Sequence, residues 1–305
     1  MNAAAESIHS LADLDAWLFP GTALAVVGRP VAHSLSPVIH NAALAELAKA
    51  QPRFADWRYF KFDLAPAELP RALLLFQQNR FHGLNLTVPH KSLVVEHLVG
   101  SDAFVRAAGA ANTLTNTGSG WCGANTDGYG LATALKEDFG TELAGAPIIL
   151  LGAGGAARGA AVECLRARCA SLWIGNRTTL KLAAFINEIA PLAGSTELRS
   201  FVLGQSPAGL PSDAIVINAT SLGLGIADPS PIDLRPLPRP RAVYDMVYRP
   251  PRTALLRQAA ELGLAHANGL SMLIHQGARS LGLWTGATVP VPVMQAAAHA
   301  ALNSA

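Results

Sequence analysis

The stretch "APIILLGAGGAARGAAVECLRA" (residues 146–167) decides the fold of this chain. It begins with an uncharged apolar run typical of a buried strand, turns through glycines and continues as an amphipathic helix. In such a turn Gly152 permits the tight bend, Gly154 lets the backbone approach a pyrophosphate, and Ala157 keeps the helix close to the strand. The free N–H groups at the start of the helix attract anions. We therefore predict a Rossmann-like dinucleotide site formed by Gly152, Ala153, Gly154, Gly155, Ala156 and Ala157; a glycine-rich turn without a ligand is the alternative.

The end of the next strand indicates which dinucleotide binds. An NAD site places Asp or Glu there to bind the ribose hydroxyls, whereas "LWIGNRT" (172–178) contains no carboxylate and ends in Asn176, Arg177 and Thr178. A guanidinium suits a 2′-phosphate because it forms bidentate, charge-assisted hydrogen bonds. The sequence therefore favours NADP over NAD. Lys181 would add a second positive charge, although a solvated helix lysine is its more ordinary role.

Strand patterns alternate with helical patterns on both sides of this turn, which is typical of an α/β fold with parallel sheets. On the N-terminal side we expect strands at 24–28, 57–64 and 83–88, helices at 37–49, 66–79 and 127–139, and a hairpin turning at Asn116-Thr117-Gly118. On the C-terminal side we expect strands at 171–175, 198–203, 214–218 and 242–246, a Pro-rich loop at 227–241, and helices at 271–284 and 291–302. Residues 1–22 are expected to form an extension with one helix around 11–18.

Composition excludes several classes of protein. The chain has 305 residues, of which 50% are hydrophobic and 14% charged, so burial offsets chain entropy and disorder is excluded as the main state. A net charge of +2 without a basic cluster disfavours nucleic acid as a partner. The apolar stretches 146–157 and 214–227 are shorter than the roughly 18–20 residues of a membrane span. Three cysteines without metal-ligand spacing, and an N-terminus without a basic leader, favour a reduced, cytoplasmic location.

A nicotinamide enzyme needs an acid/base group for the alcohol–ketone proton, which is commonly a Lys, His or Tyr whose pKa is lowered by its surroundings. None of the five lysines has a tyrosine four residues before it, which disfavours the short-chain dehydrogenase mechanism. Lys91 stands just beyond a buried strand in "GLNLTVPHK" (83–91), where Pro89 ends the strand. Lys91 is therefore the candidate, with a solvated loop lysine as the alternative.

These residues resemble the shikimate dehydrogenase family. The resemblance runs in order through nearly all of the chain after the extension, which makes it highly specific. The matching motifs are "HSLSP" (33–37), "NLTVPHK" (85–91), "ANT" (111–113), "NTDG" (125–128), "GAGGAARG" (152–159), "NRT" (176–178), "INATSLGL" (217–224), "YDMVY" (244–248), "NGLSMLIHQGA" (268–278) and "WTG" (284–286).

The resemblance implies a role for each matching site residue. Lys91 and Asp127 would form the catalytic pair, although Asp127 could equally cap the helix that follows it. The substrate carboxylate would be bound by Ser34 and Ser36, for which helix capping is the alternative, and the ring hydroxyls by amides and a hydroxyl. The implied ring-binding residues are Asn85, Thr87, Asn112 and Gln276, joined by Tyr248 from the cofactor domain. The residues implied around the nicotinamide are Thr220, Leu222, Gly269 and Met272.

The resemblance also implies the organisation and the activity. A substrate-binding domain (23–126 and 269–305) would enclose a Rossmann-like, doubly wound NADP-binding domain (127–268), with the active site in the cleft between them. The reaction would be the reversible, NADPH-dependent reduction of 3-dehydroshikimate to shikimate, without a metal, in a monomer or homodimer. A quinate/shikimate dehydrogenase of broader specificity and a non-catalytic NADP- or shikimate-binding sensor are the alternatives.

Two positions depart from the family pattern. His90 stands where Phe is usual, next to the proposed catalytic lysine, and we expect it to face solvent because Lys91 would point the other way along an extended strand. A charged histidine there would instead lower the pKa of the lysine. Leu35 replaces a common Lys between the two serines, which leaves activity on quinate open.

Overall fold

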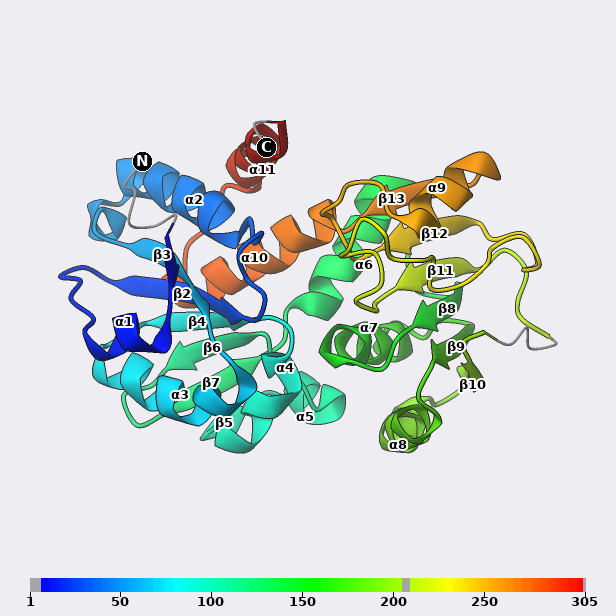
Figure 1. Cartoon of the computed structure of the whole chain (residues 1–305), viewed down its shortest axis with the longest axis horizontal. Coiled ribbons are helices and arrows are strands. Elements are labelled where there is room, and N and C mark those ends of the chain that lie inside the picture. The colour runs from blue at the N-terminus through cyan, green and yellow to red at the C-terminus, as the bar shows by residue number, and fades with distance from the viewer. Residues whose placement is uncertain (1–6, 205–208, 304–305) are drawn as a thin grey trace. The chain divides into compact units, whose positions relative to one another are not determined.

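The sheet that carries the glycine-rich turn has six parallel strands in the order β10-β9-β8-β11-β12-β13 (Figure 1). Their bounds are Pro147–Leu151 (β8), Ser171–Asn176 (β9), Glu197–Val202 (β10), Ile215–Asn218 (β11), Ala242–Asp245 (β12) and Ala265–Asn268 (β13). Counted along the chain, this is the 3-2-1-4-5-6 order of a Rossmann sheet. Ligands of such sheets bind at the carboxyl ends of the strands where the order reverses, here between β8 and β11. The computed structural model describes residues 7–204 and 209–303, and confirms the predicted Rossmann-like fold.

Helices cover this sheet and bury its apolar strands. Their bounds are Asp127–Phe139 (α6), Gly155–Arg166 (α7), Thr179–Ile189 (α8), Ala190–Leu192 (η5, a 3-10 turn) and Ala254–Glu261 (α9). Alternate residues of β8, such as Ile149 and Leu151, pack with Leu255 and Leu256 of α9 in one apolar core. The opposite side is bound by α7, whose Ala157 and Ala160 are fully buried, so small residues let this helix lie close to the strands.

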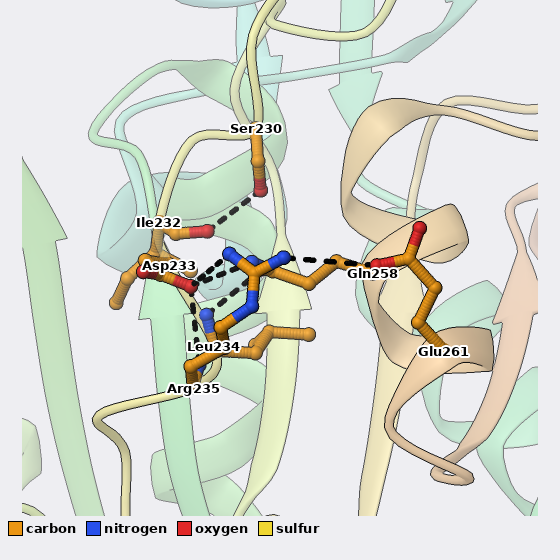
Figure 2. A network of polar contacts seen from close by, with 7 residues as sticks. All are labelled: Ser230, Ile232, Asp233, Leu234, Arg235, Gln258 and Glu261. Atoms are coloured by element: carbon orange, nitrogen blue, oxygen red, sulfur yellow. Dashed lines mark hydrogen bonds and ion pairs between the residues drawn. The ribbon is translucent and has the colours of Figure 1, made fainter.

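The Pro-rich stretch 227–241 is a loop, as predicted, and polar contacts hold it to α9 (Figure 2). Gln258 on α9 accepts a hydrogen bond from the backbone N–H of Leu234 at 2.9 Å and donates one to Asp233. Arg235 lies between the carboxylates of Asp233, at 3.5 Å, and Glu261, at 3.7 Å (Figure 2). A part-buried hydrogen bond to the Leu234 backbone and several exposed charged contacts therefore hold the loop on α9. Each exposed ion pair contributes little to stability.

The second sheet has seven strands in the order β1-β3-β2-β4-β6-β7-β5 (Figure 1). Their bounds are Ile8–His9 (β1), Ala23–Gly28 (β2), Arg58–Asp63 (β3), Gly83–Leu86 (β4), Gly100–Ser101 (β5), Thr113–Asn116 (β6) and Trp121–Ala124 (β7). The predicted hairpin is confirmed, since β6 and β7 are antiparallel and Gly118 between them has φ +83°. The sheet is mixed, because β4 also pairs antiparallel with β6, a pairing that the sequence did not predict.

Helices cover the second sheet as well. Their bounds are Leu11–Asp15 (α1), Ser36–Ala50 (α2), Pro52–Phe54 (η2), Pro66–Glu68 (η3), Leu69–Gln78 (α3), His90–Leu93 (α4), Val94–His97 (η4), Ala103–Ala108 (α5), Leu270–Thr285 (α10) and Val291–Asn303 (α11). Figure 1 shows α2 and α11 above this sheet and α1 and α3 below it. Ala25 and Val27 of β2 face α3, where Phe76 closes an aromatic core.

Residues 7–22 are part of this second sheet rather than a separate extension. β1 pairs with β3 in parallel, and the predicted helix is short, covering only Leu11–Asp15. Trp17 packs on the rings of Phe60, Phe62 and Phe81 at centroid distances of 4.9, 5.4 and 5.1 Å. The segment therefore covers both the edge of β3 and part of the aromatic core. Residues 1–6 lie outside the described part of the chain.

The chain divides into two compact units, which we call the outer unit (1–126 and 273–305) and the inserted unit (127–272). The helix α10 begins in the inserted unit and continues into the outer one. That the outer unit binds substrate and the inserted unit binds NADP remains a prediction at this stage. Within residues 7–204 and 209–303, no helix combines the length and apolar character of a membrane span.

Candidate active site

The glycine-rich turn has the backbone geometry that a phosphate-binding loop requires. Gly152, directly after β8, has φ +118°, and a Cβ there would lie 2.9 Å from the carbonyl oxygen of Ala219. Gly154 is the exposed N-cap of α7, and a Cβ on it would meet nothing within 4 Å. Ala157 on the first turn of α7 is fully buried. The turn therefore leaves open space in front of the helix N-terminus, where backbone N–H groups favour anions.

The end of β9 presents the residues predicted to select NADP. Asn176 ends the strand and donates a hydrogen bond from its side-chain amide to the carbonyl of Thr178 at 3.1 Å. This bond shapes the turn into α8 and leaves Arg177 and Thr178 exposed. Lys181, in the first turn of α8, is exposed too. The phosphate-binding role of these side chains stays a prediction.

The loop after β11, which contains Thr220 and Leu222, is built on a fully buried asparagine, Asn218. The Oδ1 atom of Asn218 accepts hydrogen bonds from the backbone N–H and the hydroxyl of Thr220, at 3.0 and 2.7 Å. Its Nδ2 atom donates to the carbonyl of Leu222 at 3.0 Å and to Asp245 at 2.9 Å. One amide therefore sets the backbone of the whole turn at the carboxyl end of β11.

Asp245 at the end of β12 anchors that asparagine. Its carboxylate is fully buried and accepts hydrogen bonds from Asn218, from the hydroxyl of Thr253 at 2.6 Å, and from the N–H of Val247 at 3.0 Å. Burial raises the pKa of Asp245, and these hydrogen bonds oppose the rise only in part. The carboxylate thus joins the loops that follow β11 and β12 with the N-terminus of α9.

The start of α10 is held by Tyr244 of β12. The backbone N–H of Met272 donates to the Tyr244 hydroxyl at 3.3 Å, and Ser271 donates to Asp138 of α6 at 2.6 Å. Gly269 is close to the backbone that follows β12, since a Cβ there would lie 2.1 Å from the carbonyl oxygen of Met246. A packing reason thus accounts for this glycine. Tyr248, predicted to reach the substrate, is half-buried in the inserted unit.

The Lys91 segment leaves β4 and is tied to neighbouring backbone. Thr87 accepts a hydrogen bond from the N–H of His90 at 2.8 Å, which closes the turn into the short helix α4. The carbonyl of Lys91 accepts from the N–H of Ala111 at 2.8 Å, and Ala111 directly precedes Asn112. Thr87 and Lys91 are both half-buried. The backbone thus brings the lysine segment next to the amide that sequence analysis placed in the same site.

The expectation that His90 faces solvent was wrong. The residue is fully buried, and its Nε2 lies 2.9 Å from the carbonyl of Leu64, to which it donates as a neutral ring. The segment is helical rather than extended, so the alternation assumed for a strand does not apply. Burial lowers the pKa of His90, which keeps the ring uncharged at neutral pH.

A buried cluster of amides and hydroxyls occupies the outer unit, and we call it the amide cluster. It contains three predicted residues and three that the sequence analysis did not identify: Asn85, Asn112 and Gln276, with Thr113, Thr126 and Ser280. The Asn112 amide donates to Gln276 Oε1 at 3.1 Å and to Thr126 Oγ1 at 2.9 Å. Its oxygen accepts from the N–H of Thr126 at 2.8 Å. The cluster is uncharged, and each of its groups can both donate and accept hydrogen bonds.

The two predicted serines lie at the start of α2. Ser34 Oγ accepts a hydrogen bond from the N–H of Ser36 at 3.3 Å, while the N-cap position of α2 is Leu35 and no side chain caps the helix. Ser36 begins α2 and is buried, with 5% of its surface exposed. The helix starts one residue earlier than predicted, so the backbone at Ser36 already carries the positive end of the helix dipole.

Asp127 is the first residue of α6 and is buried, with 2% of its surface exposed. It follows Thr126 of the amide cluster directly in the chain. Its position at a helix start fits the capping alternative as well as a catalytic one. No group of three His, Cys, Asp or Glu side chains among residues 7–204 and 209–303 has an arrangement that could hold a metal ion.

Comparison with known proteins gives matches at both ends of the outer unit. The family model "Shikimate dehydrogenase substrate binding domain" matches residues 26–114, and "Shikimate 5'-dehydrogenase C-terminal domain" matches residues 269–299. A shikimate dehydrogenase (NADP(+)) of Symbiobacterium thermophilum is 40% identical over 290 residues, which is 93% of this chain and 96% of that protein.

Two solved structures resemble this fold over most of its length. Shikimate 5-dehydrogenase from Thermus thermophilus, in complex with NADP(H) and shikimate, superposes with a TM-score of 0.79 at 35% identity, over 92% of this chain and all of the other (100%). A 5-ketofructose reductase from a Gluconobacter species superposes with a TM-score of 0.76 at 30% identity, over 93% and 100% of the two chains. The second match is thus named for a substrate other than shikimate.

Proposed function

The chain belongs to the shikimate dehydrogenase family, and we propose that it catalyses the reversible, NADP-dependent reduction of 3-dehydroshikimate to shikimate. This reaction belongs to the shikimate pathway, which leads to aromatic amino acids. The observation that carries the proposal is the amide cluster and its place beside Lys91. Ala111, which directly precedes Asn112 of the cluster, donates a backbone hydrogen bond to the carbonyl of Lys91. Neutral groups that donate and accept hydrogen bonds suit a polyhydroxylated ring, and a lysine beside them suits proton transfer to its oxygen.

The inserted unit fits NADP. The open space at Gly154 and the N–H groups of α7 suit the pyrophosphate, and exposed Arg177 suits the 2′-phosphate. Asn176 and Thr178 would line the same end, while Thr220, Leu222 and Met272 would pack around the nicotinamide, with Gly269 shaping the approach. When bound, the cofactor supplies the hydride and the protein supplies orientation and the proton.

The outer unit would hold the substrate by groups matched to its chemistry. Ser34 and Ser36 would donate to the carboxylate at the dipole-positive start of α2. Thr87, Asn112 and Gln276 would bind ring hydroxyls. Asn85 would hold this group of side chains in place through its hydrogen bonds to Asn112 and Ser280. Tyr248, a residue of the inserted unit, is the remaining residue that we propose for substrate binding.

Lys91 would transfer the proton to the substrate oxygen during reduction and accept it during oxidation. Asp127 would act with Lys91 as the second member of the catalytic pair. Buried His90, being uncharged at neutral pH, adds no positive charge beside Lys91.

We also propose a cytoplasmic location and a monomeric or homodimeric state. Cys122, Cys164 and Cys169 are free thiols, which fits a reducing compartment. Burial raises the pKa of Cys164 and Cys169, the latter to about 11, so neither thiol is a reactive thiolate.

The test is the absorbance at 340 nm of the purified full chain with shikimate and NADP. Parallel assays replace shikimate with quinate, NADP with NAD, and the pair with 5-ketofructose and NADPH. We expect activity mainly with shikimate and NADP. Comparable activity on quinate or with NAD would move the protein to the broader quinate/shikimate class, and NADP binding without turnover of any of these compounds would favour a sensor.

A further inference from the structure

Tyr59 of β3 is a buried tyrosine whose hydroxyl ends in the amide cluster. The side chain is fully buried, and its hydroxyl donates to Asn85 Oδ1 at 2.7 Å. Its backbone is held on both sides by Asn41 of α2, which donates to the Tyr59 carbonyl and accepts from the Tyr59 N–H, each at 2.9 Å. The phenol is thus fixed at its base and at its tip.

The orientation of the Asn85 amide follows from its neighbours. Its Nδ2 lies 3.0 Å from the carbonyl of Asn112, and that carbonyl can only accept a hydrogen bond. The nitrogen must therefore face Asn112, and the oxygen must face Tyr59. If the amide were flipped, Asn85 Oδ1 would face the Asn112 carbonyl oxygen. Two buried acceptors without a hydrogen between them cost free energy.

The same nitrogen connects Tyr59 to α10. Asn85 Nδ2 also lies 3.0 Å from Ser280 Oγ and 3.2 Å from Thr113 Oγ1. Ser280 in turn donates to the carbonyl of Gln276 at 3.0 Å, one turn earlier on α10. Both polar atoms of the Asn85 side chain thus form hydrogen bonds with protein groups. Asn85 is therefore suited to hold the neighbouring side chains in place rather than to bind the ring directly.

The imidazole ring of His40 restricts the position of the Tyr59 ring. The two rings stack at a centroid distance of 4.1 Å and an interplanar angle of 17°. His40 Nδ1 donates a hydrogen bond to the carbonyl of Ser36 at 2.8 Å, which fixes the imidazole on α2. Gly277 makes room for it, because a Cβ there would lie 3.0 Å from His40 Cε1. These contacts fix the position of the Tyr59 hydroxyl.

Ser36 is the second partner of the phenol. Its side chain forms a hydrogen bond with Tyr59, although burial dominates and raises the pKa of the phenol well above its ordinary value. Tyr59 therefore stays protonated and can donate to Asn85 while accepting from Ser36. One hydroxyl thus links the serine proposed for the substrate carboxylate with the amides proposed for its ring.

We propose that Tyr59 is a positioning residue for substrate recognition: its hydroxyl holds the oxygen end of the Asn85 amide in place, and through Asn85 it maintains the hydrogen-bonding pattern of Asn112, Ser280 and Gln276. It does so without touching the substrate. The inference rests on the proposed function, because it assigns the amide cluster to the shikimate ring.

The test is Tyr59→Phe, which removes one oxygen and keeps the ring stacked on His40. The variant leaves Asn85 Oδ1 without its donor, so we expect the KM for shikimate to rise on the order of tenfold, with kcat changed less. The Kd for NADP, measured by cofactor fluorescence, should match the wild type because the cofactor-binding residues lie in the inserted unit. Wild-type KM for shikimate in this variant would overturn the inference.

Phe76→Leu is the matched control for loss of stability. Phe76 lies in the aromatic core between α3 and the sheet, outside the amide cluster, and its truncation destabilises the outer unit without touching a polar group. Its KM for shikimate should equal that of the wild type at a temperature where both are folded. An equal rise in KM in both variants would show a general structural effect and overturn the inference.

Ser280→Ala keeps the proposal falsifiable if Tyr59→Phe does not fold. It removes another partner of the same amide, so it should also raise the KM for shikimate and spare NADP binding; an unchanged KM would overturn the inference. Where both variants fold, their combination should raise KM by less than the product of the single effects, because both act through Asn85.

The wild-type chain separates this inference from the proposed function. If the wild type neither binds nor oxidises shikimate, the proposed function and this inference are both overturned. If the wild type is active and Tyr59→Phe has the wild-type KM, only the inference is overturned.

Discussion

The two units arrange their buried polar groups differently. The outer unit buries a cluster of hydroxyls and amides, whereas the inserted unit buries the carboxylate of Asp245 with three donors around it. Neutral groups can exchange one hydrogen-bond partner for another, so they are suited to a ligand with hydroxyls. A carboxylate only accepts, and once its donors are in place it holds loops in a fixed shape. The difference fits the proposal that the outer unit recognises the substrate, and it shows that the buried carboxylate of the inserted unit fixes the loops after β11 and β12.

Lys91→Ala gives the strongest test of this division of labour. Loss of a general acid/base should lower turnover by on the order of 10²–10⁴, while the Kd for NADPH stays unchanged because the inserted unit is untouched. Initial rates at saturating substrates and a fluorescence titration with NADPH measure the two quantities. Lys136→Ala, at an exposed lysine paired with Glu142, is the control and should keep wild-type turnover. Unchanged turnover in Lys91→Ala would refute the assignment.

Acidification should change the stability contributions of two buried titratable groups in opposite directions: His40 in the outer unit and Asp245 in the inserted unit. Burial lowers the pKa of His40 from 6.5 to about 4. Between these values the unfolded chain binds a proton that the folded chain does not, so the contribution of His40 is complete above about pH 6.5 and is lost as the pH falls toward 4. The loss should approach about 3 kcal/mol. His40→Phe should remove this pH dependence from the free energy of unfolding measured with urea.

Asp245 should behave in the opposite way. Its folded-state pKa is raised, so the folded chain takes up the proton before the unfolded chain does, and stability is gained as the pH falls through that pKa. The stability difference between wild type and Asp245→Asn should therefore grow on acidification, while that between wild type and His40→Phe shrinks. Stability differences that move in the same direction would contradict the opposite pKa shifts of His40 and Asp245.

Arg177→Asp tests the inserted unit alone. Replacing the proposed phosphate partner by a carboxylate should weaken NADPH binding by about 10–100-fold, with a smaller effect on NADH, since only NADPH carries the 2′-phosphate. Arg257→Asp, an exposed arginine of α9, is the charge-matched control. The ratio of NADPH to NADH affinity is the measurement; a ratio equal to that of the wild type would exclude Arg177 as the phosphate-binding residue.

His90→Phe should have the smallest effect. The substitution loses the hydrogen bond to the Leu64 carbonyl but also removes Nδ1, a buried atom without a hydrogen-bond partner among the described residues. These changes oppose each other, so the free energy of unfolding should change by less than about 1 kcal/mol. Turnover should stay near the wild-type value. A large fall in turnover would show that the imidazole itself acts on Lys91.

Much of the inserted unit could be predicted because its signals are local. A strand, a glycine turn and a helix follow one another within 146–167, and each residue type has a steric reason to be there. The outer unit was predicted less completely. Its antiparallel pair of β4 and β6 joins segments about thirty residues apart, and β1 and β5 are too short to give a periodic signal.

The residues that sequence analysis missed share a physical reason. Tyr59 in "RYFKFD" and Ser280 on α10 look like ordinary members of their elements, and the only signal is a polar atom on an otherwise buried face. His90 was misplaced because a strand was assumed where a helical turn begins.

The sequence by itself determined the family, the Rossmann turn, the preference for NADP and the candidate lysine, because these depend on residue types at fixed local spacing. Only the tertiary structure decided which of the polar residues meet. Tyr59, Asn85 and Ser280 are joined by hydrogen bonds across separations of 26 and 195 residues, which no local pattern encodes. Burial decided the rest, since the same imidazole or carboxylate has a different charge state and a different task once water is excluded.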